Sequence, residues 1–171
     1  MNEMKQKCRL HRTAAISLSE GLGSEGWRYF VYGRQCPVSN GFIHDKETNL
    51  CIKISEQQLE ADEGEQFCTN NSAKLVTLET PNKQARVSNL LAKMQFSYNK
   101  DSYRIGLHYI APQWVWNNGE VLSYNNWGQN EPNCKCACGG VIVYALGWYD
   151  NGDNCKKETA YSVCEIEIKI M

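Results

Sequence analysis

The pattern of apolar and polar positions changes twice along this chain. Residues 50–54 (LCIKI) alternate in polarity and are rich in β-branched side chains, which predicts a strand. Farther on, four apolar residues recur at helical spacing: Val87, Leu90, Leu91 and Met94. From residue 103 onward, short apolar runs alternate with Asn- and Gly-rich turns, which predicts short strands and loops. The pattern therefore predicts helices in the first half of the chain and short strands in the second half.

Two helix starts can be predicted from capping signals. Ser55 and Gln58 have the spacing of a capping box, so a helix is expected to begin at Ser55 and to continue through residues 59–68 (LEADEGEQFC). Gly64 is a weak point within it, because glycine disfavours a helix interior. The second helix is expected to begin with Thr80 as N-cap and Pro81 at the first helical position.

The first 35 residues differ in composition and periodicity from the rest of the chain. Residues 1–35 are mixed polar, carry three closely spaced glycines and show no sustained period, which predicts a flexible lead-in without sheet pairing. Residues 27–32 (WRYFVY) within it are apolar enough to form an extra strand instead. We therefore expect one ordered domain over residues 36–171.

A long stretch between Trp116 and Val141 has little strand character and is rich in Asn, Gly and Cys. A loop of this length in a compact domain is usually functional or disordered. Its tryptophan and cysteine residues favour an ordered, functional loop. The sequence Glu131-Pro132-Asn133 lies on it.

Composition narrows the classes of function. A formal net charge of -1 gives no general attraction to nucleic acid or membranes, and Lys and Arg are dispersed. No run approaches the roughly 18 apolar residues of a membrane span. Nine cysteines point to an oxidising, extracellular or secreted location, although residues 1–23 contain no recognisable signal peptide. We therefore expect one of three explanations. The true N-terminus is missing from this sequence, the chain is an isoform or fragment of a larger one, or its export route is unusual.

Catalytic signals are absent from the sequence. The three histidines (His11, His44 and His108) have no metal-ligand spacing and no neighbouring nucleophile motif. No Gly-rich phosphate loop or Gly-x-Ser-x-Gly elbow is present, so we expect no enzyme and no catalytic residues. Asn70-Asn71-Ser72 is a glycosylation acceptor if the chain is exported, or else an ordinary helix-ending pair of asparagines.

Six segments, taken in order, resemble the C-type lectin-like domain over residues 36–168. They are residues 65–68 (EQFC), 104–107 (RIGL, with Arg104 in place of tryptophan), 114–127 (WVWNNGEVLSYNNW), 130–133 (NEPN), 147–155 (GWYDNGDNC) and 161–166 (YSVCEI). The resemblance implies an α+β fold of two helices with small antiparallel sheets and a long loop, stapled by disulfides. It also implies that most of Trp114, Trp116, Trp127 and Trp148 are core residues.

The resemblance further implies a cysteine pairing for the long form of the domain. The implied disulfides are Cys36–Cys51, Cys68–Cys164 and Cys138–Cys155. Three cysteines are left over: Cys8, Cys134 and Cys136. They could pair with each other, stay free or link chains into a disulfide-bonded oligomer. The Cys-x-Cys-x-Cys run could alternatively bind a soft metal such as zinc.

In the resembled family, the Glu-Pro-Asn motif binds sugar through calcium. Calcium takes 6–8 oxygen ligands, and Glu131 and Asn133 offer a carboxylate and an amide oxygen. The resemblance implies a cis bond before Pro132, with both side chains binding Ca²⁺ and two neighbouring sugar hydroxyls. This residue order goes with mannose, N-acetylglucosamine and glucose-like sugars, whereas Gln-Pro-Asp goes with galactose.

Two positions depart from the family pattern. Cys136 stands where the family has a glutamate, and Tyr149 stands where it has an asparagine. A shift of one residue would let Asp150 and Asn151 serve instead. The expected metal ligands are then Glu131, Asn133, Asp150 and Asn151, and the expected sugar contacts are Glu131, Asn133, Asp150 and a stacking Tyr149. The expected partners are glycans or glycoproteins. The alternative is a calcium-independent domain of this fold that binds a protein or glycan surface.

Overall fold

The computed structural model describes residues 18–22, 28–32, 35–46, 49–94, 102–133, 141–143, 147–150 and 157–168. The chain divides into two compact units. One comprises Met1–Gln35 with Ile168–Met171, and the other comprises Cys36–Glu167.

The first unit contains an antiparallel hairpin of β1 (Leu18–Leu22) and β2 (Arg28–Tyr32). Leu18 lies opposite Tyr32, and Leu22 lies opposite Arg28. The prediction of a lead-in without sheet pairing is therefore wrong. The β-branched and aromatic residues of RYFVY explain the strand that forms there. The flexibility of this lead-in and the extent of the domain stay predictions.

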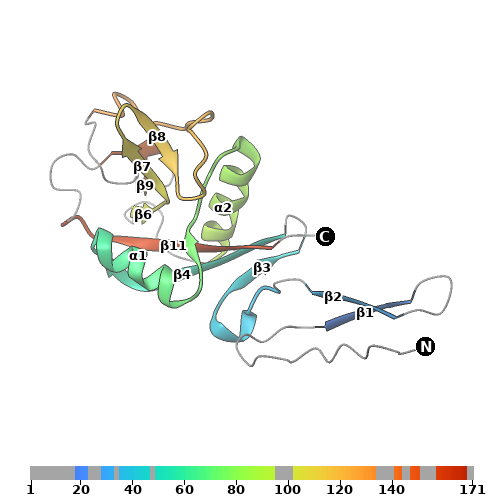
Figure 1. Ribbon diagram of the computed structural model, residues 1–171. Coiled ribbons are helices and arrows are strands. Elements are labelled where there is room, and N and C mark those ends of the chain that lie inside the picture. The colour runs from blue at the N-terminus through green and yellow to red at the C-terminus, as the bar shows by residue number, and fades with distance from the viewer. Residues whose placement is uncertain are drawn as a thin grey trace, which may run out of the picture. The chain divides into compact units, whose positions relative to one another are not determined.

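The second unit is built on a sheet in which β11 is central (Figure 1). The strands run in the order β10-β9-β6-β11-β4-β3, with β5 also paired to β11. Their bounds are β3 (Ile43–Asp45), β4 (Leu50–Leu59), β5 (Lys74–Leu75), β6 (Ser102–Arg104), β9 (Val141–Val143), β10 (Gly147–Tyr149) and β11 (Ala160–Glu167). β11 pairs with β4 antiparallel and with β6 parallel. A separate hairpin joins β7 (Leu107–Ile110) to β8 (Gln113–Trp116).

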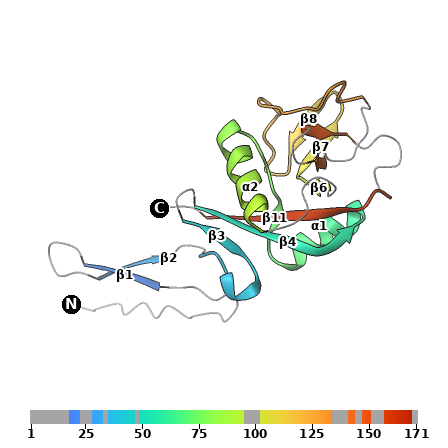
Figure 2. The same cartoon turned by 180° about the vertical axis from the view of Figure 1, so that it is seen from behind.

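Within the described residues, two helices and a short 3-10 turn (η1, Val38–Asn40) accompany the sheet. Figure 2 shows the two helices from behind. α1 (Ala61–Asn70) contacts β11, β4 and β5, and α2 (Pro81–Lys93) adds its apolar stripe to the core. Val87 and Leu91 are fully buried, whereas Leu90 and Met94 pack against the same cluster from its edge. The predicted stripe is confirmed. None of the helices in the described ranges is long and apolar enough to cross a bilayer.

The two predicted helix starts have different outcomes. The start at Thr80 is confirmed, because Thr80 Oγ1 accepts a hydrogen bond from the Lys83 amide at 3.2 Å. The start at Ser55 is wrong: β4 continues to Leu59, and α1 begins at Ala61 with a capping box between Glu60 and Glu63. The sheet uses the Ser55 hydroxyl instead.

Ser55 is buried, and its Oγ forms hydrogen bonds with backbone groups of two strands, β11 and β4 itself. It accepts from the Ser162 amide of β11 at 2.9 Å and donates to the Gln57 carbonyl at 2.7 Å. These bonds accompany a register shift in the β4–β11 pairing between Tyr161 and Val163. A contact with Ser162 cannot be read from local sequence, which is why the capping signal misled.

Two of the implied disulfides are confirmed. Cys36–Cys51 links the segment before η1 to β4, and Cys68–Cys164 ties α1 to the central strand β11. Their Cα–Cα distances are 5.5 and 5.3 Å. The implied Cys138–Cys155 pair, and the leftover Cys8, Cys134 and Cys136, lie outside the described residues.

Gly64 allows α1 to approach β11 closely. A Cβ at this position would clash with Ser162 Oγ, and the next nearest atom, Ser162 Cβ, would lie 3.4 Å away. The glycine that weakens the helix in isolation is therefore required by packing. Ser162 Oγ makes no hydrogen bond of its own within the described part of the chain.

Gly64→Ala is expected to lower the free energy of unfolding by about 1–3 kcal/mol, because overpacking outweighs the gain of roughly 1 kcal/mol in helix propensity. Ser162→Ala removes the clashing oxygen and provides the matched background. There, Gly64→Ala should be neutral or stabilising. Urea unfolding of the four chains measures this coupling, and equal effects in both backgrounds would contradict it.

Candidate functional site

Glu131, Asn133 and Asp150 converge at one place on the surface of the second unit. The Asn133 backbone amide donates to Asp150 Oδ1 at 3.0 Å and to Glu131 Oε2 at 3.3 Å. The Asn133 side chain donates from Nδ2 to Glu131 Oε1 at 2.9 Å. The peptide bond between Glu131 and Pro132 is cis, the conformation that the resemblance implies. Asn133 and Asp150, 17 positions apart in the sequence, therefore belong with Glu131 to one cluster of polar side chains.

Backbone hydrogen bonds between the long loop and β10 bring these residues together. The Trp148 amide donates to the Asn126 carbonyl at 2.7 Å, and the Gly128 amide donates to the Trp148 carbonyl at 2.9 Å. The Glu131 amide then closes a turn onto the Gly128 carbonyl at 3.2 Å. Asn130 occupies the left-handed region in this turn, with φ 65°, which Asn tolerates better than most residues. Asp150 is the second residue after Trp148.

Trp148 anchors this arrangement in the core. It is fully buried, and its Nε1 donates to Gln84 Oε1 of α2 at 2.7 Å. Edge-on aromatic contacts surround it, from Trp116, Trp127 and Tyr124. Trp116 is also buried, whereas Trp114 and Trp127 are partly buried against the core. The implied core role of the tryptophans agrees with these positions.

The site is rich in negative charge. Asp150 is only 5% exposed, and Glu131 is half-buried beside it. Burial, together with a hydrogen bond to the Asp150 carboxyl group and repulsion from its charge, raises the pKa of Glu131 above its ordinary value. A proton or a cation would relieve this repulsion.

This donor set fits a hard cation in part. Two carboxylates and a carboxamide are the oxygen ligands that calcium prefers. Among the described residues, no three His, Cys, Asp or Glu side chains form a metal cluster. The fit therefore depends on the Asn133 carboxamide as a third ligand.

The other predicted site residues are distributed as follows. Tyr149, the residue directly before Asp150, is half-buried in β10, where its backbone pairs with that of Val141 in β9. Asn151 and Cys136 lie outside the described residues. Sequence reasoning missed Gln84, which holds the Trp148 indole. Its signal was a polar residue three positions before Val87, on the apolar stripe of α2.

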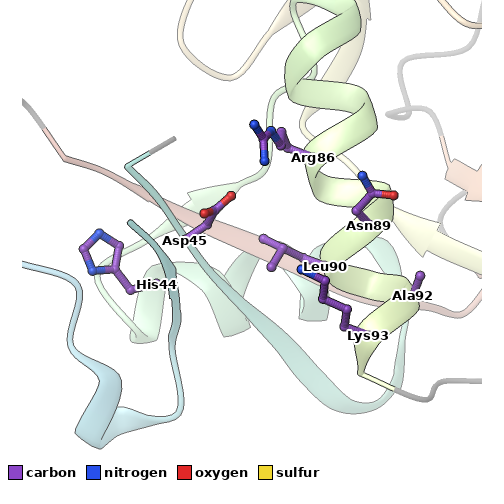
Figure 3. A pocket seen from close by; sticks show the side chains of 7 residues that line it. All are labelled: His44, Asp45, Arg86, Asn89, Leu90, Ala92 and Lys93. Atoms are coloured by element: carbon purple, nitrogen blue, oxygen red, sulfur yellow. The ribbon is translucent and has the colours of Figure 1, made fainter. Parts of the chain in front are cut away.

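Two hollows lie away from the convergent residues. One, of about 510 Å³, is lined by residues of β3 and α2: His44, Asp45, Arg86, Asn89, Leu90, Ala92 and Lys93. In Figure 3 the Asp45 carboxylate and the Arg86 guanidinium point toward one another across it. The second, of about 430 Å³, includes a His108–Glu65 pair with Nε2 and Oε1 3.7 Å apart. Neither hollow includes Glu131, Asn133 or Asp150.

The sequence pattern of the Lectin C-type domain family matches residues 57–166. The chain is 26% identical to C-type mannose receptor 2 of Homo sapiens over a 134-residue alignment, which covers 68% of this chain and 9% of the receptor. It is 25% identical to C-type lectin lectoxin-Lio3 of Erythrolamprus poecilogyrus over a 162-residue alignment, which covers 90% of this chain and 89% of that protein. The chain thus spans a small part of one relative and most of the other.

Solved structures share the fold. The carbohydrate-recognition domain of the mouse scavenger receptor C-type lectin superposes with a TM-score of 0.63 at 21% identity, covering 78% of this chain and 98% of that domain. The calcium-independent C-type lectin SPL-2 from Saxidomus purpuratus gives 0.58 at 23% identity, covering 68% and 86%. At these identities the likeness shows the fold alone.

Proposed function

This chain belongs to the Lectin C-type domain family, and we propose that it binds mannose- or N-acetylglucosamine-type sugars through a calcium ion held by Glu131, Asn133 and Asp150. Its partners are glycans or glycoproteins. The protein itself is extracellular or secreted in this proposal. The disulfides Cys36–Cys51 and Cys68–Cys164 support such a location, because they persist in oxidising compartments.

The observation that carries this proposal is the convergence at Asn133. Its backbone amide contacts both carboxylates, so Glu131 and Asp150 face a common point. Two facing carboxylates carry about two negative charges, and burial, followed by the neighbouring Asp150 carboxyl group, raises the pKa of Glu131. A bound calcium would offset the repulsion between the two carboxylates.

The residues have distinct roles in this proposal. Glu131 and Asp150 supply the charged ligands, and the Asn133 carboxamide oxygen and Asn151 supply neutral ones. Bound calcium would also coordinate two neighbouring sugar hydroxyls, which exchange hydrogen bonds with Glu131 and Asn133. Tyr149, directly before Asp150, offers a ring for stacking. Because Cys136 and Tyr149 replace oxygen ligands, we expect calcium to bind more weakly than in a domain with the full set.

The second candidate is calcium-independent binding of a protein or glycan surface. One contact favours it: the Asn133 amide already gives the Asp150 carboxylate a hydrogen bond at 3.0 Å. SPL-2, which has this fold, is a calcium-independent C-type lectin. The two candidates differ in one simple respect, because a chelator abolishes binding only in the first.

Exchanging the motif tests the sugar class. Glu131→Gln with Asn133→Asp keeps the net charge of the pair but reverses the positions of carboxylate and carboxamide. We expect preference to move from mannose toward galactose, with calcium still required. Retention of wild type and the double variant on immobilised mannose and galactose, with and without chelator, measures it. Equal retention of both chains on both sugars would contradict the proposed role of this pair.

A further inference from the structure

Two adjacent asparagines at the end of α1 have different surroundings. Asn71 is the C-cap, and both ends of its carboxamide are engaged. Its Nδ2 donates to the Phe67 carbonyl at 2.8 Å, and its Oδ1 accepts from Lys53 Nζ at 2.8 Å. Asn71 therefore ends the helix and holds Lys53, which also approaches the Phe67 ring at 5.7 Å.

Asn70 has no such role. It is exposed, and its Oδ1 accepts from Gln66 Nε2 at 2.8 Å, one turn earlier. Within the described part of the chain, Asn70 Nδ2 donates no hydrogen bond. The helix-ending function thus belongs entirely to Asn71, and the amide nitrogen of Asn70 remains accessible.

The next residues continue this exposed turn. Ser72 is exposed, has a positive φ of 55°, and donates from its backbone amide to the Thr69 carbonyl at 2.9 Å. Asn70-Asn71-Ser72 is the one Asn-x-Ser/Thr triplet in the 171-residue sequence. The triplet therefore combines the acceptor pattern with a spare, accessible nitrogen.

We propose that Asn70 carries an N-linked glycan. The donor class is an oligosaccharide attached to a lipid diphosphate. Asn70 Nδ2 forms a bond to the anomeric carbon, the bond from that carbon to the phosphate oxygen breaks, and the lipid diphosphate leaves with the electron pair. One amide proton passes to a base of the transferase, and no oxidation or reduction occurs.

The surrounding structure tolerates this modification. The glycan would extend from the exposed end of α1 without displacing the Asn71–Lys53 contact or the Gln66 hydrogen bond to Oδ1. Glu131, Asn133 and Asp150 belong to other elements. Sugar retention by the proposed calcium site is therefore expected to be the same with and without the glycan.

The test uses the full chain, directed into the secretory pathway of mammalian cells by a cleavable signal peptide. Medium and lysate are compared before and after treatment with peptide N-glycosidase, and mass spectrometry locates any Asn70 converted to Asp. The variants are Asn70→Gln and Ser72→Ala. Asn89→Gln, at another exposed asparagine outside any acceptor triplet, is the matched control.

We expect one glycosidase-sensitive shift in the wild type and in Asn89→Gln, and none in Asn70→Gln or Ser72→Ala. An unmodified Asn70 peptide from wild-type chain in the secretory pathway would overturn the proposal, as would a shift that persists in Asn70→Gln. The peptide analysis of wild type decides the matter even if a variant fails to fold. Failure here leaves mannose retention, and hence the proposed function, unaffected.

Discussion

Trp148→Ala is expected to lower the free energy of unfolding by about 3–5 kcal/mol, the cost of removing a fully buried aromatic side chain. The loss has two parts. Removal of the indole leaves a cavity among Trp116, Trp127 and Tyr124. Gln84 Oε1 also loses the hydrogen bond that Trp148 Nε1 donates at 2.7 Å. Because Asp150 follows two residues later, the same change should displace the convergent carboxylates.

Trp148→Phe separates these two parts. It keeps much of the ring packing but leaves Gln84 Oε1 without its donor, which costs roughly 1–3 kcal/mol. Combining it with Gln84→Ala should recover part of that cost. Urea unfolding followed by circular dichroism measures all four chains. A Trp148→Ala chain within about 1 kcal/mol of wild type would show that Trp148 does not anchor the loop.

Asp150→Asn is expected to weaken calcium-dependent sugar retention by about tenfold or more, because it halves the charge offered by the two carboxylates. Asparagine has nearly the same shape and can still accept the hydrogen bond from the Asn133 amide. The fold should therefore persist, and the unfolding free energy without calcium should not fall, since repulsion on Glu131 is relieved.

Asp45→Asn, in the hollow between β3 and α2, is the matched control and should retain full binding. Retention of calcium-dependent binding by Asp150→Asn at the wild-type level would remove Asp150 from the ligand set. Loss of binding in both variants would point instead to a general effect of charge.

The pH dependence of the same binding follows from Glu131. Calcium needs the ionised carboxylate, and burial together with Asp150 raises the Glu131 pKa above the ordinary 4.5. Protonation therefore competes with calcium, and affinity falls as pH falls. The decline should begin at a higher pH than for an unperturbed glutamate. Calcium titrations at successively lower pH measure it, and a pH-independent affinity would contradict it.

Local signals in the sequence were sufficient for some elements and misleading for others. The Thr80–Pro81 start and the Val87–Leu91 stripe were predictable, because capping and helical period act within a few residues. Ser55 misled, since its hydroxyl bonds Ser162, 107 residues away. A capping pattern carries no information about such a partner.

The candidate site was predictable chiefly through the resemblance. Spacing within the chain gave no reason to bring Asp150 to Asn133, and the contact depends on the backbone hydrogen bonds between the loop and β10. The disulfides Cys36–Cys51 and Cys68–Cys164 likewise came from the family pattern. Gln84 and the hairpin β1–β2 were missed or underweighted, because a single polar residue or a short apolar run is a weak signal.

Calorimetric titration of the refolded chain with calcium, with and without mannose, tests the proposed function most directly. The proposal predicts heat of calcium binding, and tighter calcium binding when mannose is present, because coupling between the two ligands is reciprocal. Mannose alone, in chelator, should give no heat. Mannose binding that is unchanged in chelator, or an absence of calcium binding at any concentration tested, would contradict the proposal and favour calcium-independent recognition.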